Sequence, residues 1–287
     1  MSNKVIVISG ATGQQGGATL RALAGKGFQI RALTRDPNSE AARAVAATGA
    51  ELVKADLDDE ASVRAALQGA WGAYGVQNTW TAGVEGEEAQ GHRFATIARE
   101  AGVQHYVYAS VASADRQTGI PHFENKFRVE NTVKTLGFPS FAIIRPVFFM
   151  SNLPSPWFLN GDKLVTALDP TTVLQMIDVK DIGQYGALAF TDARFKNLEL
   201  DIAGDQATMP QAAAILSEAL GRTIKYVQVP IGEIRKNSED LALMLEWFEK
   251  VGYDVDIDAT VTEYGVKPTR LAEWASTLTV AVPVRRV

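Results

Sequence analysis

The stretch KVIVISGATGQQGG, residues 4–17, decides the fold of this chain. An apolar run rich in β-branched residues, typical of a buried strand, leads directly into glycines at positions 10, 13, 16 and 17 and then into an amphipathic segment. A glycine turn of this kind lets the backbone approach a phosphate, and the N–H groups at the helix N-terminus favour its charge. The spacing G-x-x-G-x-x-G departs from the G-x-G-x-x-G form, and glycines alone also occur in flexible turns, so the context has to decide.

The context is a regular alternation of short β-rich runs with helical segments. The predicted strands are 4–9, 29–34, 51–55, 73–77, 105–110 and 141–145. The predicted helices between them are 14–26, 38–48, 59–69, 86–101 and 122–136. Strands joined through helices imply right-handed crossovers and a parallel sheet covered on both faces. We therefore expect an α/β chain with a doubly wound (Rossmann) sheet.

The rhythm changes after Pro146, where further prolines interrupt the pattern. Thr208 and Gln211 have the spacing of a capping box at the start of another helix. These features predict a dinucleotide-binding domain over residues 1–150 and a smaller α+β lobe over 151–287. We expect a segment at about 172–203 to return to the Rossmann sheet.

Composition excludes several classes of function. The chain has 287 residues, of which 46% are hydrophobic, with no cysteine and three histidines. Thiolate chemistry and disulfides are thereby excluded, and we expect no metal site. A formal net charge of -5 argues against a nucleic-acid surface. We find neither a signal peptide nor an apolar run of the roughly 18 residues needed to span a membrane, and expect a cytoplasmic protein.

The end of the second strand selects the dinucleotide. Arginine there accommodates a 2′-phosphate, whereas an acid bonds the ribose 2′-hydroxyl. Arg35 stands at the expected distance from the glycines, and Asp36 precedes a proline, as the first residue of a turn does. We favour NADP(H), with NAD(H) as the alternative in which Asp36 contacts the ribose. After the third strand, Asp56 is a candidate for the adenine side, while Asp58 is a candidate helix cap.

With these motifs in order, the chain resembles the NmrA-like family of atypical short-chain dehydrogenases/reductases, and especially its HSCARG-type NADPH sensors. The resemblance rests on the glycine loop together with TRDP (34–37), ADLDD (55–59), VQNTW (76–80), YVYAS (106–110), HFENK (122–126), RPVFFMSN (145–152), MIDVKDIG (176–183) and RLAEW (270–274). It implies an NADP(H) pocket and a cleft beside the C-terminal lobe.

The resemblance also assigns roles to individual residues. It gives the pyrophosphate to Gly10, Thr12, Gly13, Gln14, Gln15 and Gly16, and the 2′-phosphate to Arg35. It places Asn78 and Trp80 beside the nicotinamide. Lys126 matches the lysine that holds the nicotinamide ribose, and the stretch from Pro146 to Phe149 would pass near the nicotinamide amide.

The catalytic signature of the enzymatic relatives is incomplete. Their motif is Tyr-x-x-x-Lys, in which the lysine lowers the pKa of the phenol that supplies the proton. Here His122 stands four residues before Lys126. His122 is a candidate acid, the alternative being that it caps or packs a helix. Ser110 matches a serine near the reacting carbonyl, although a serine is also common at a strand end. Lys126 taken alone would be a solvated helical lysine.

Tyr106 and Tyr108 alternate with Val107 and are expected to pack in the sheet rather than to donate protons. Aromatic residues later in the chain are expected to line an apolar substrate pocket, although any one of them could be a core residue: Trp157, Phe158, Trp247 and Phe248.

Two functions stay open. The first is an NADPH-dependent reductase of a small apolar acceptor such as a quinone, imine or enone. The second is a non-catalytic redox sensor that regulates a protein partner. A sugar-nucleotide epimerase or dehydratase ranks last, because it normally needs the tyrosine.

Overall fold

The structure, a computed structural model, describes residues 4–278 and divides the chain into two compact units. The first unit comprises the residues up to Gln117, then Pro121–Arg145 and Ile182–Asp201. The second comprises Thr118–Ile120, Pro146–Asp181 and the residues from Ile202 onward. The change of unit thus falls between Arg145 and Pro146, close to the expected boundary at residue 150. The last part of the expected lobe, 279–287, lies outside the described residues.

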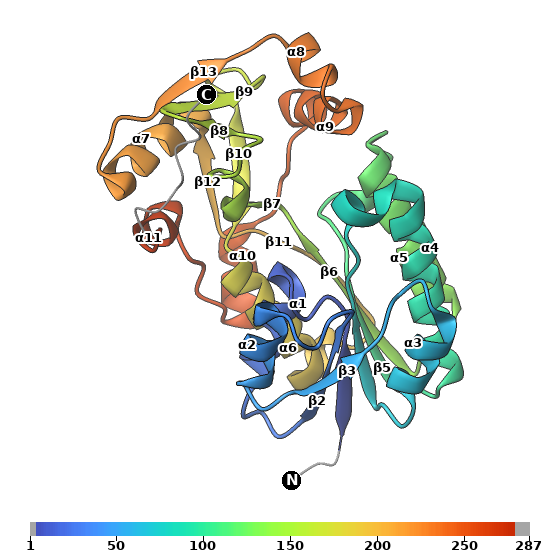
Figure 1. Ribbon diagram of the computed structural model, residues 1–287. Helices are drawn as coiled ribbons and strands as arrows, with labels where there is room; N and C mark the ends of the chain where they lie inside the picture. Colours follow the sequence, from blue (N-terminus) through green and yellow to red (C-terminus); the bar gives the residue numbers. More distant parts are fainter. Residues whose placement is uncertain (1–3, 279–287) are drawn as a thin grey trace. The chain divides into compact units, whose positions relative to one another are not determined.

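The first unit is built on a seven-stranded sheet in the order β11-β6-β5-β4-β1-β2-β3 (Figure 1). Its strands are β1 Val5–Ile8, β2 Gln29–Thr34, β3 Glu51–Lys54, β4 Gly72–Gly75, β5 His105–Ala109, β6 Ser140–Pro146 and β11 Leu198–Ile202. Neighbouring strands from β3 through β1 to β6 pair in parallel. From β1 the chain adds β2 and β3 on one side and then β4, β5 and β6 on the other. The doubly wound α/β fold is therefore confirmed.

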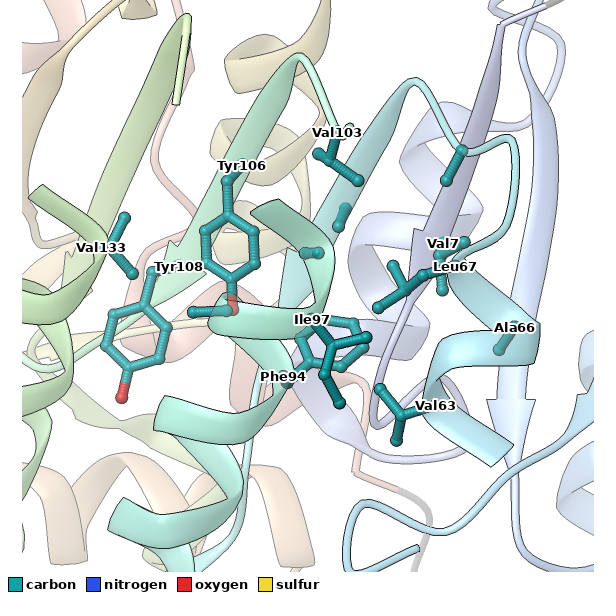
Figure 2. Close-up of a cluster of buried hydrophobic side chains, with 14 of the residues drawn as sticks. Val7, Val63, Ala66, Leu67, Phe94, Ile97, Val103, Tyr106, Tyr108 and Val133 are labelled. Carbon is teal, nitrogen blue, oxygen red and sulfur yellow. The ribbon is translucent and has the colours of Figure 1, made fainter. Parts of the chain in front are cut away.

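Helices cover both faces of this sheet. They are α1 Gln14–Leu23, α2 Glu40–Ala46, α3 Glu60–Leu67, α4 Thr79–Glu100, α5 Pro121–Thr135 and α6 Val179–Thr191, with short 3-10 turns η1 Ala114–Arg116 and η3 Ala193–Phe195. The face under α3, α4 and α5 holds a continuous apolar core (Figure 2). Tyr106 and Tyr108 lie in this core with their side chains fully buried, so the expectation that they pack in the sheet is confirmed.

The opposite face depends on a close approach between α1 and α6. A Cβ atom at Gly183 would lie 2.5 Å from the backbone carbon of Ala18, and one at Gly186 would lie 2.4 Å from Thr19 Oγ1. Only glycine allows the two helices to touch in this way. The glycine of the MIDVKDIG motif is thus a packing residue.

Helix α4 begins earlier than predicted. Asn78 caps it by accepting a hydrogen bond from the backbone N–H of Trp80, at 2.9 Å. Inside the helix, Gly83 has φ 75° and ψ 170°, a backbone region that is essentially restricted to glycine. A single turn, Thr79–Ala82, therefore precedes the break, and the regular helix follows it.

The second unit holds two small sheets. Strands β7 Phe148–Phe149, β10 Val173–Ile177 and β12 Asp205–Thr208 form one, and β8 Leu159–Asn160, β9 Lys163–Thr166 and β13 Lys225–Gln228 form the other. Its helices are α7 Met209–Leu220, α8 Ile231–Arg235, α9 Glu239–Lys250, α10 Ile257–Tyr264 and α11 Leu271–Ser276, with the 3-10 turn η2 Met150–Asn152. The predicted capping box of Thr208 and Gln211 at the start of α7 is confirmed.

The predicted return to the large sheet is narrower in the structure than 172–203. Residues 182–201 lie in the first unit, and β11 forms the edge of its sheet next to β6. The preceding strand β10 instead pairs with β7 and β12 in the second unit. A β-rich run does not by itself indicate which sheet will accept it, because the pairing partner is set by tertiary packing.

The α1–α6 contact predicts that Gly183→Ala destabilises the fold. The added methyl group would overlap the backbone of α1, and overpacking of this kind costs roughly 1–3 kcal/mol. Urea unfolding monitored by circular dichroism measures the change. Gly232→Ala in α8 is the control, because a Cβ there would meet nothing within 4 Å. Equal stability of Gly183→Ala and wild type would contradict the packing role of Gly183.

A second prediction concerns acid sensitivity at His105. Its Nε2 lies 2.6 Å from the carbonyl oxygen of Ala189 and its Nδ1 lies 2.8 Å from Ser140 Oγ. Burial lowers the pKa of His105 from 6.5 to about 4, against the opposing effect of the Ala189 bond. The folded state thus prefers the neutral form of His105. The contribution of this residue to the free energy of unfolding is fully present above pH 6.5 and is lost as the pH falls towards 4. The total loss is about 3 kcal/mol. Chemical denaturation at a series of pH values across this window measures the free energy of unfolding. It should fall less steeply with pH in His105→Gln than in wild type. Identical pH profiles of the two proteins would refute the role of His105.

Candidate functional site

The turn between β1 and α1 has the geometry of a phosphate cradle. Gly10 has φ 57°, and the turn closes through a 2.9 Å hydrogen bond that the N–H of Gly13 donates to the carbonyl oxygen of Gly10. A Cβ at Gly16 would lie 2.4 Å from Gly10 O and 2.7 Å from Ser9 O, so any larger residue would push the helix away from the strand. Glycine is required at position 10 by the backbone conformation and at position 16 by the close approach.

The N-terminus of α1 is capped by Gly13, which has no side chain to accept hydrogen bonds from the first helical N–H groups. Thr12 and Gln14 are exposed beside it, and Gln15 Oε1 is buried with no hydrogen-bond partner among the described residues. The helix dipole and its first amides favour an anion at this end. The residues present therefore fit the pyrophosphate of a dinucleotide.

Ser9 anchors this loop, a role that the sequence reasoning missed. Its buried hydroxyl donates to Val76 O at 2.9 Å and accepts from Val76 N at 2.8 Å. The glycine loop is thereby fixed to the end of β4, directly before Gln77 and Asn78. A serine at the end of a buried β-strand was the available signal, although serine is too common there to identify the contact.

The two candidates at the end of β2 behave differently. Asp36 Oδ1 accepts the N–H of Asn38 at 2.9 Å, so this carboxylate is used in the local turn, as the sequence suggested. Arg35 is exposed, and within residues 4–278 it makes no hydrogen bond or ion pair. The guanidinium of Arg35 is thus available to a ligand, whereas the carboxylate of Asp36 is occupied by a hydrogen bond within its own turn.

The acidic turn after β3 corrects one expectation. Asp59, and not Asp58, caps α3, accepting from Ala61 N at 3.1 Å. Asp58 instead forms an ion pair with Arg93 at 3.3 Å, because its side chain is directed towards α4. Asp56 is exposed and accepts the N–H of Asp58. Its proposed place beside the adenine stays a prediction.

The motif HFENK forms the first turns of α5. His122 and Lys126 lie one turn apart on this helix, as expected from their spacing. The His122 ring lies 5.8 Å from the ring of Trp80, whose side chain is 64% exposed. Lys126 is not a solvated surface lysine: its Nζ lies 2.7 Å from Oε1 of Glu87, a buried acid of α4.

Ser110 follows β5 and is 2% exposed. Its hydroxyl donates to Glu130 Oε1, and Glu130 in turn binds Arg145 through a hydrogen bond of 2.8 Å from Nε. Arg145 also pairs with Glu199 at 2.6 Å. These contacts place Ser110 within a buried charge network and favour a structural role for it over a catalytic one.

The tyrosines of β5 provide no replacement for the missing acid. Burial raises the pKa of both Tyr106 and Tyr108 far above the ordinary value for a phenol. Their hydroxyls have no hydrogen-bond partner among the described residues. Proton donation by either phenol near neutral pH is therefore disfavoured.

The remaining candidate residues belong to the second unit. Phe148 packs against Phe158 and Phe248, with ring centroids 5.4 Å and 6.3 Å away. Trp247 and Phe248 are buried, whereas Trp157 is 55% exposed. Trp247, Phe158 and Phe248 are thus core residues of this unit. Pro146 ends β6, and Phe149 lies in β7. A place for these residues in a pocket stays a prediction.

A hollow of about 280 Å³ lies at the amino-terminal ends of β2 and β3. Its lining includes Leu20, Phe28 and Ile30. Ligands of open α/β sheets bind beyond the carboxyl ends of the strands, where the glycine loop stands, so this hollow is at the opposite end from the candidate site.

In the part of the chain that the structure describes, no group of three or more His, Asp or Glu side chains could hold a metal ion. None of the helices within residues 4–278 has the length and apolar character needed to cross a membrane.

Comparison with known proteins identifies the family. The model of the NmrA-like family matches residues 2–275. The chain belongs to the NmrA-like family. The expected resemblance is thus confirmed for the family, while the HSCARG-type subgroup stays a prediction.

Among curated relatives, this NmrA-like chain is 36% identical over 159 residues to an NmrA-like family domain-containing oxidoreductase, FrzB, of Cladobotryum sp.. The match covers 52% of this chain and 47% of the relative, so the matched region spans about half the length of that protein.

Two solved structures share the fold of this NmrA-like chain over nearly its whole length. The negative transcriptional regulator NmrA in complex with NADP has a TM-score of 0.81 at 22% identity, covering 97% of this chain and 96% of the other. An NADPH-dependent quinone oxidoreductase from Escherichia coli complexed with NADPH has a TM-score of 0.79 at 24% identity, covering 94% and 98%. Both of those proteins hold NADP(H).

Proposed function

We propose that this chain binds NADP(H) and reduces a small apolar acceptor of the quinone, imine or enone type. The observation that carries the cofactor part is the contrast at the end of β2: Arg35 makes no hydrogen bond or ion pair with the described residues, whereas Asp36 is used in its own turn. A forked guanidinium is well suited to a 2′-phosphate. The glycine cradle would hold the pyrophosphate, and the NADP(H) bound by two proteins of the same fold supports this choice.

The reductase part rests on the turn that carries Trp80 and on the start of α5. When bound, the cofactor supplies the hydride. The exposed indole of Trp80 beside the His122 ring offers an apolar face for a planar acceptor. Lys126 supplies a fixed positive charge, which stabilises negative charge that develops on an acceptor oxygen or nitrogen.

Proton supply does not require the missing tyrosine. An imidazole is able to donate a proton, and His122 stands one helical turn from Lys126. Quinones and enones also spread the arriving charge and take their proton from water. Acceptors of this class therefore tolerate the replacement of tyrosine by histidine better than simple ketones do.

The second candidate function is a non-catalytic NADP(H) sensor of the HSCARG type. It is favoured by the histidine at the position of the acid and by the fold shared with a negative transcriptional regulator that binds NADP. In that role, occupancy of the cradle shifts a conformational equilibrium and changes the affinity for a protein partner.

Removal of the Arg35 side chain should separate the two dinucleotides. In Arg35→Ala we expect the Kd for NADPH to rise on the order of 10- to 100-fold, because a charge-assisted phosphate contact is lost, while the Kd for NADH changes little. Isothermal titration calorimetry measures both. Lys26→Ala removes an equal charge from an exposed site at the other end of α1 and should leave both constants unchanged. Equal losses for NADPH and NADH would contradict the phosphate role.

A turnover assay tests the reductase against the sensor. Wild-type protein should oxidise NADPH in the presence of at least one quinone, imine or enone, and Lys126→Met should lower kcat/KM by about 10²-fold. Loss of the reduced-nicotinamide absorbance follows the reaction. Tight NADPH binding without oxidation by any acceptor, together with ligand-dependent self-association in scattering experiments, would reject the reductase in favour of the sensor.

A further inference from the structure

Glu87 is a buried acid of α4 that the cofactor and acceptor assignments leave unused. Glu87 is only 1% exposed. Three donors converge on its carboxylate: Lys126 Nζ at 2.7 Å, Asn125 Nδ2 at 2.9 Å and the Thr79 hydroxyl. This burial could not be expected from the sequence, because Glu87 stands among several acids in the run EGEE (85–88).

The carboxylate is held in its charged form. Burial alone would raise the pKa of Glu87, but the Lys126 ammonium and the three hydrogen bonds lower it below the ordinary value for a glutamate. A buried charge left without its partner is strongly unfavourable. The attraction between Lys126 and Glu87 is therefore stronger than that of an ion pair at the protein surface.

Glu87 also joins two elements that carry candidate site residues. Thr79 belongs to the single turn before the break at Gly83, the turn that bears Trp80. Asn125 belongs to α5 and donates as well to the carbonyl oxygen of Val84, just after the break, at 2.9 Å. The position of the Trp80 turn and that of the first turns of α5 are thus fixed by the same carboxylate.

The contact constrains how Lys126 can act. A lysine ammonium has three N–H donors. Within residues 4–278 the Nζ of Lys126 makes one hydrogen bond, the one to Glu87. That bond fixes the position of the nitrogen and leaves two donors for a ligand.

We propose that Glu87 is a positioning residue, which holds Lys126 Nζ so that its two remaining donors meet the hydroxyls of the nicotinamide ribose. The inference rests on the NADP(H) function proposed above. Glu87 itself touches neither cofactor nor acceptor in this role; it acts through Lys126.

The test compares two ligands that differ in the part Lys126 would hold. NADPH contains the nicotinamide ribose, and adenosine 2′,5′-bisphosphate contains only the adenosine half with its 2′-phosphate. Wild type, Glu87→Gln, Lys126→Met and the double variant are titrated with each ligand by calorimetry. Glu88→Gln is the control, because Glu88 neighbours Glu87 but pairs with Arg128 at a partly exposed site.

For Glu87→Gln we expect the Kd for NADPH to rise about tenfold, with no change for adenosine 2′,5′-bisphosphate, since an oriented charge-assisted contact is lost only at the ribose. The double variant should bind NADPH no more weakly than Lys126→Met, because the two residues act as one unit. Glu88→Gln should match wild type with both ligands.

Three results would overturn the proposal: unchanged NADPH affinity in Glu87→Gln, an equal loss for both ligands, or additive losses in the double variant. If Glu87→Gln fails to fold, Glu87→Asp, which keeps the charge but withdraws it by one methylene group, must show the same selective loss. Wild-type protein that binds neither ligand would refute the proposed function, and this inference with it. Binding of both ligands without the selective loss refutes the inference alone.

Discussion

The contact between the backbone of Gly16 and the carbonyl oxygens of Ser9 and Gly10 is the constraint on which the first unit depends. It brings the start of α1 against the end of β1, so that strand, turn and helix form one rigid element. Ser9 then ties this element to the backbone of Val76 at the end of β4. A preorganised turn of this kind presents amide donors to a phosphate without first having to be ordered.

Helix α5 carries two buried acid–base networks with different consequences. Towards its N-terminus, Asn125 and Lys126 bind the carboxylate of Glu87. One and two turns further along, Glu130 and Lys134 belong to the network of Arg145, which also holds Ser110. The first network leaves donors available on Lys126, whereas in the second the one donor of the Ser110 hydroxyl is used by Glu130. The same helix thus combines a site that suits ligand binding with a site that suits the fixation of β5 and β6.

The sequence predicted the elements of the first unit well, since alternating β-rich and helical runs with glycine at the turns have few alternative folds. It also predicted the use of Asp36 in a turn. It could not predict the start of α4, because Gly83 interrupts the helical pattern and the preceding turn depends on the Asn78 cap. Nor could the sequence predict the partner of Lys126. Glu85, Glu87 and Glu88 are the same residue type in one short run, and only the packing of α4 against α5 determines which of them is buried.

The route of the chain has a consequence for how this protein is made. The edge strand β11 and the helix α6 complete the large sheet only after a long excursion through the second unit. A fragment that ends near residue 150 would leave β6 as an open edge and would uncover the glycine-dependent contact surface of α1, and both defects promote aggregation. During synthesis, the nascent Rossmann domain therefore stays incomplete until residue 202 has left the ribosome, which makes this interval the one in which a chaperone would be of most use.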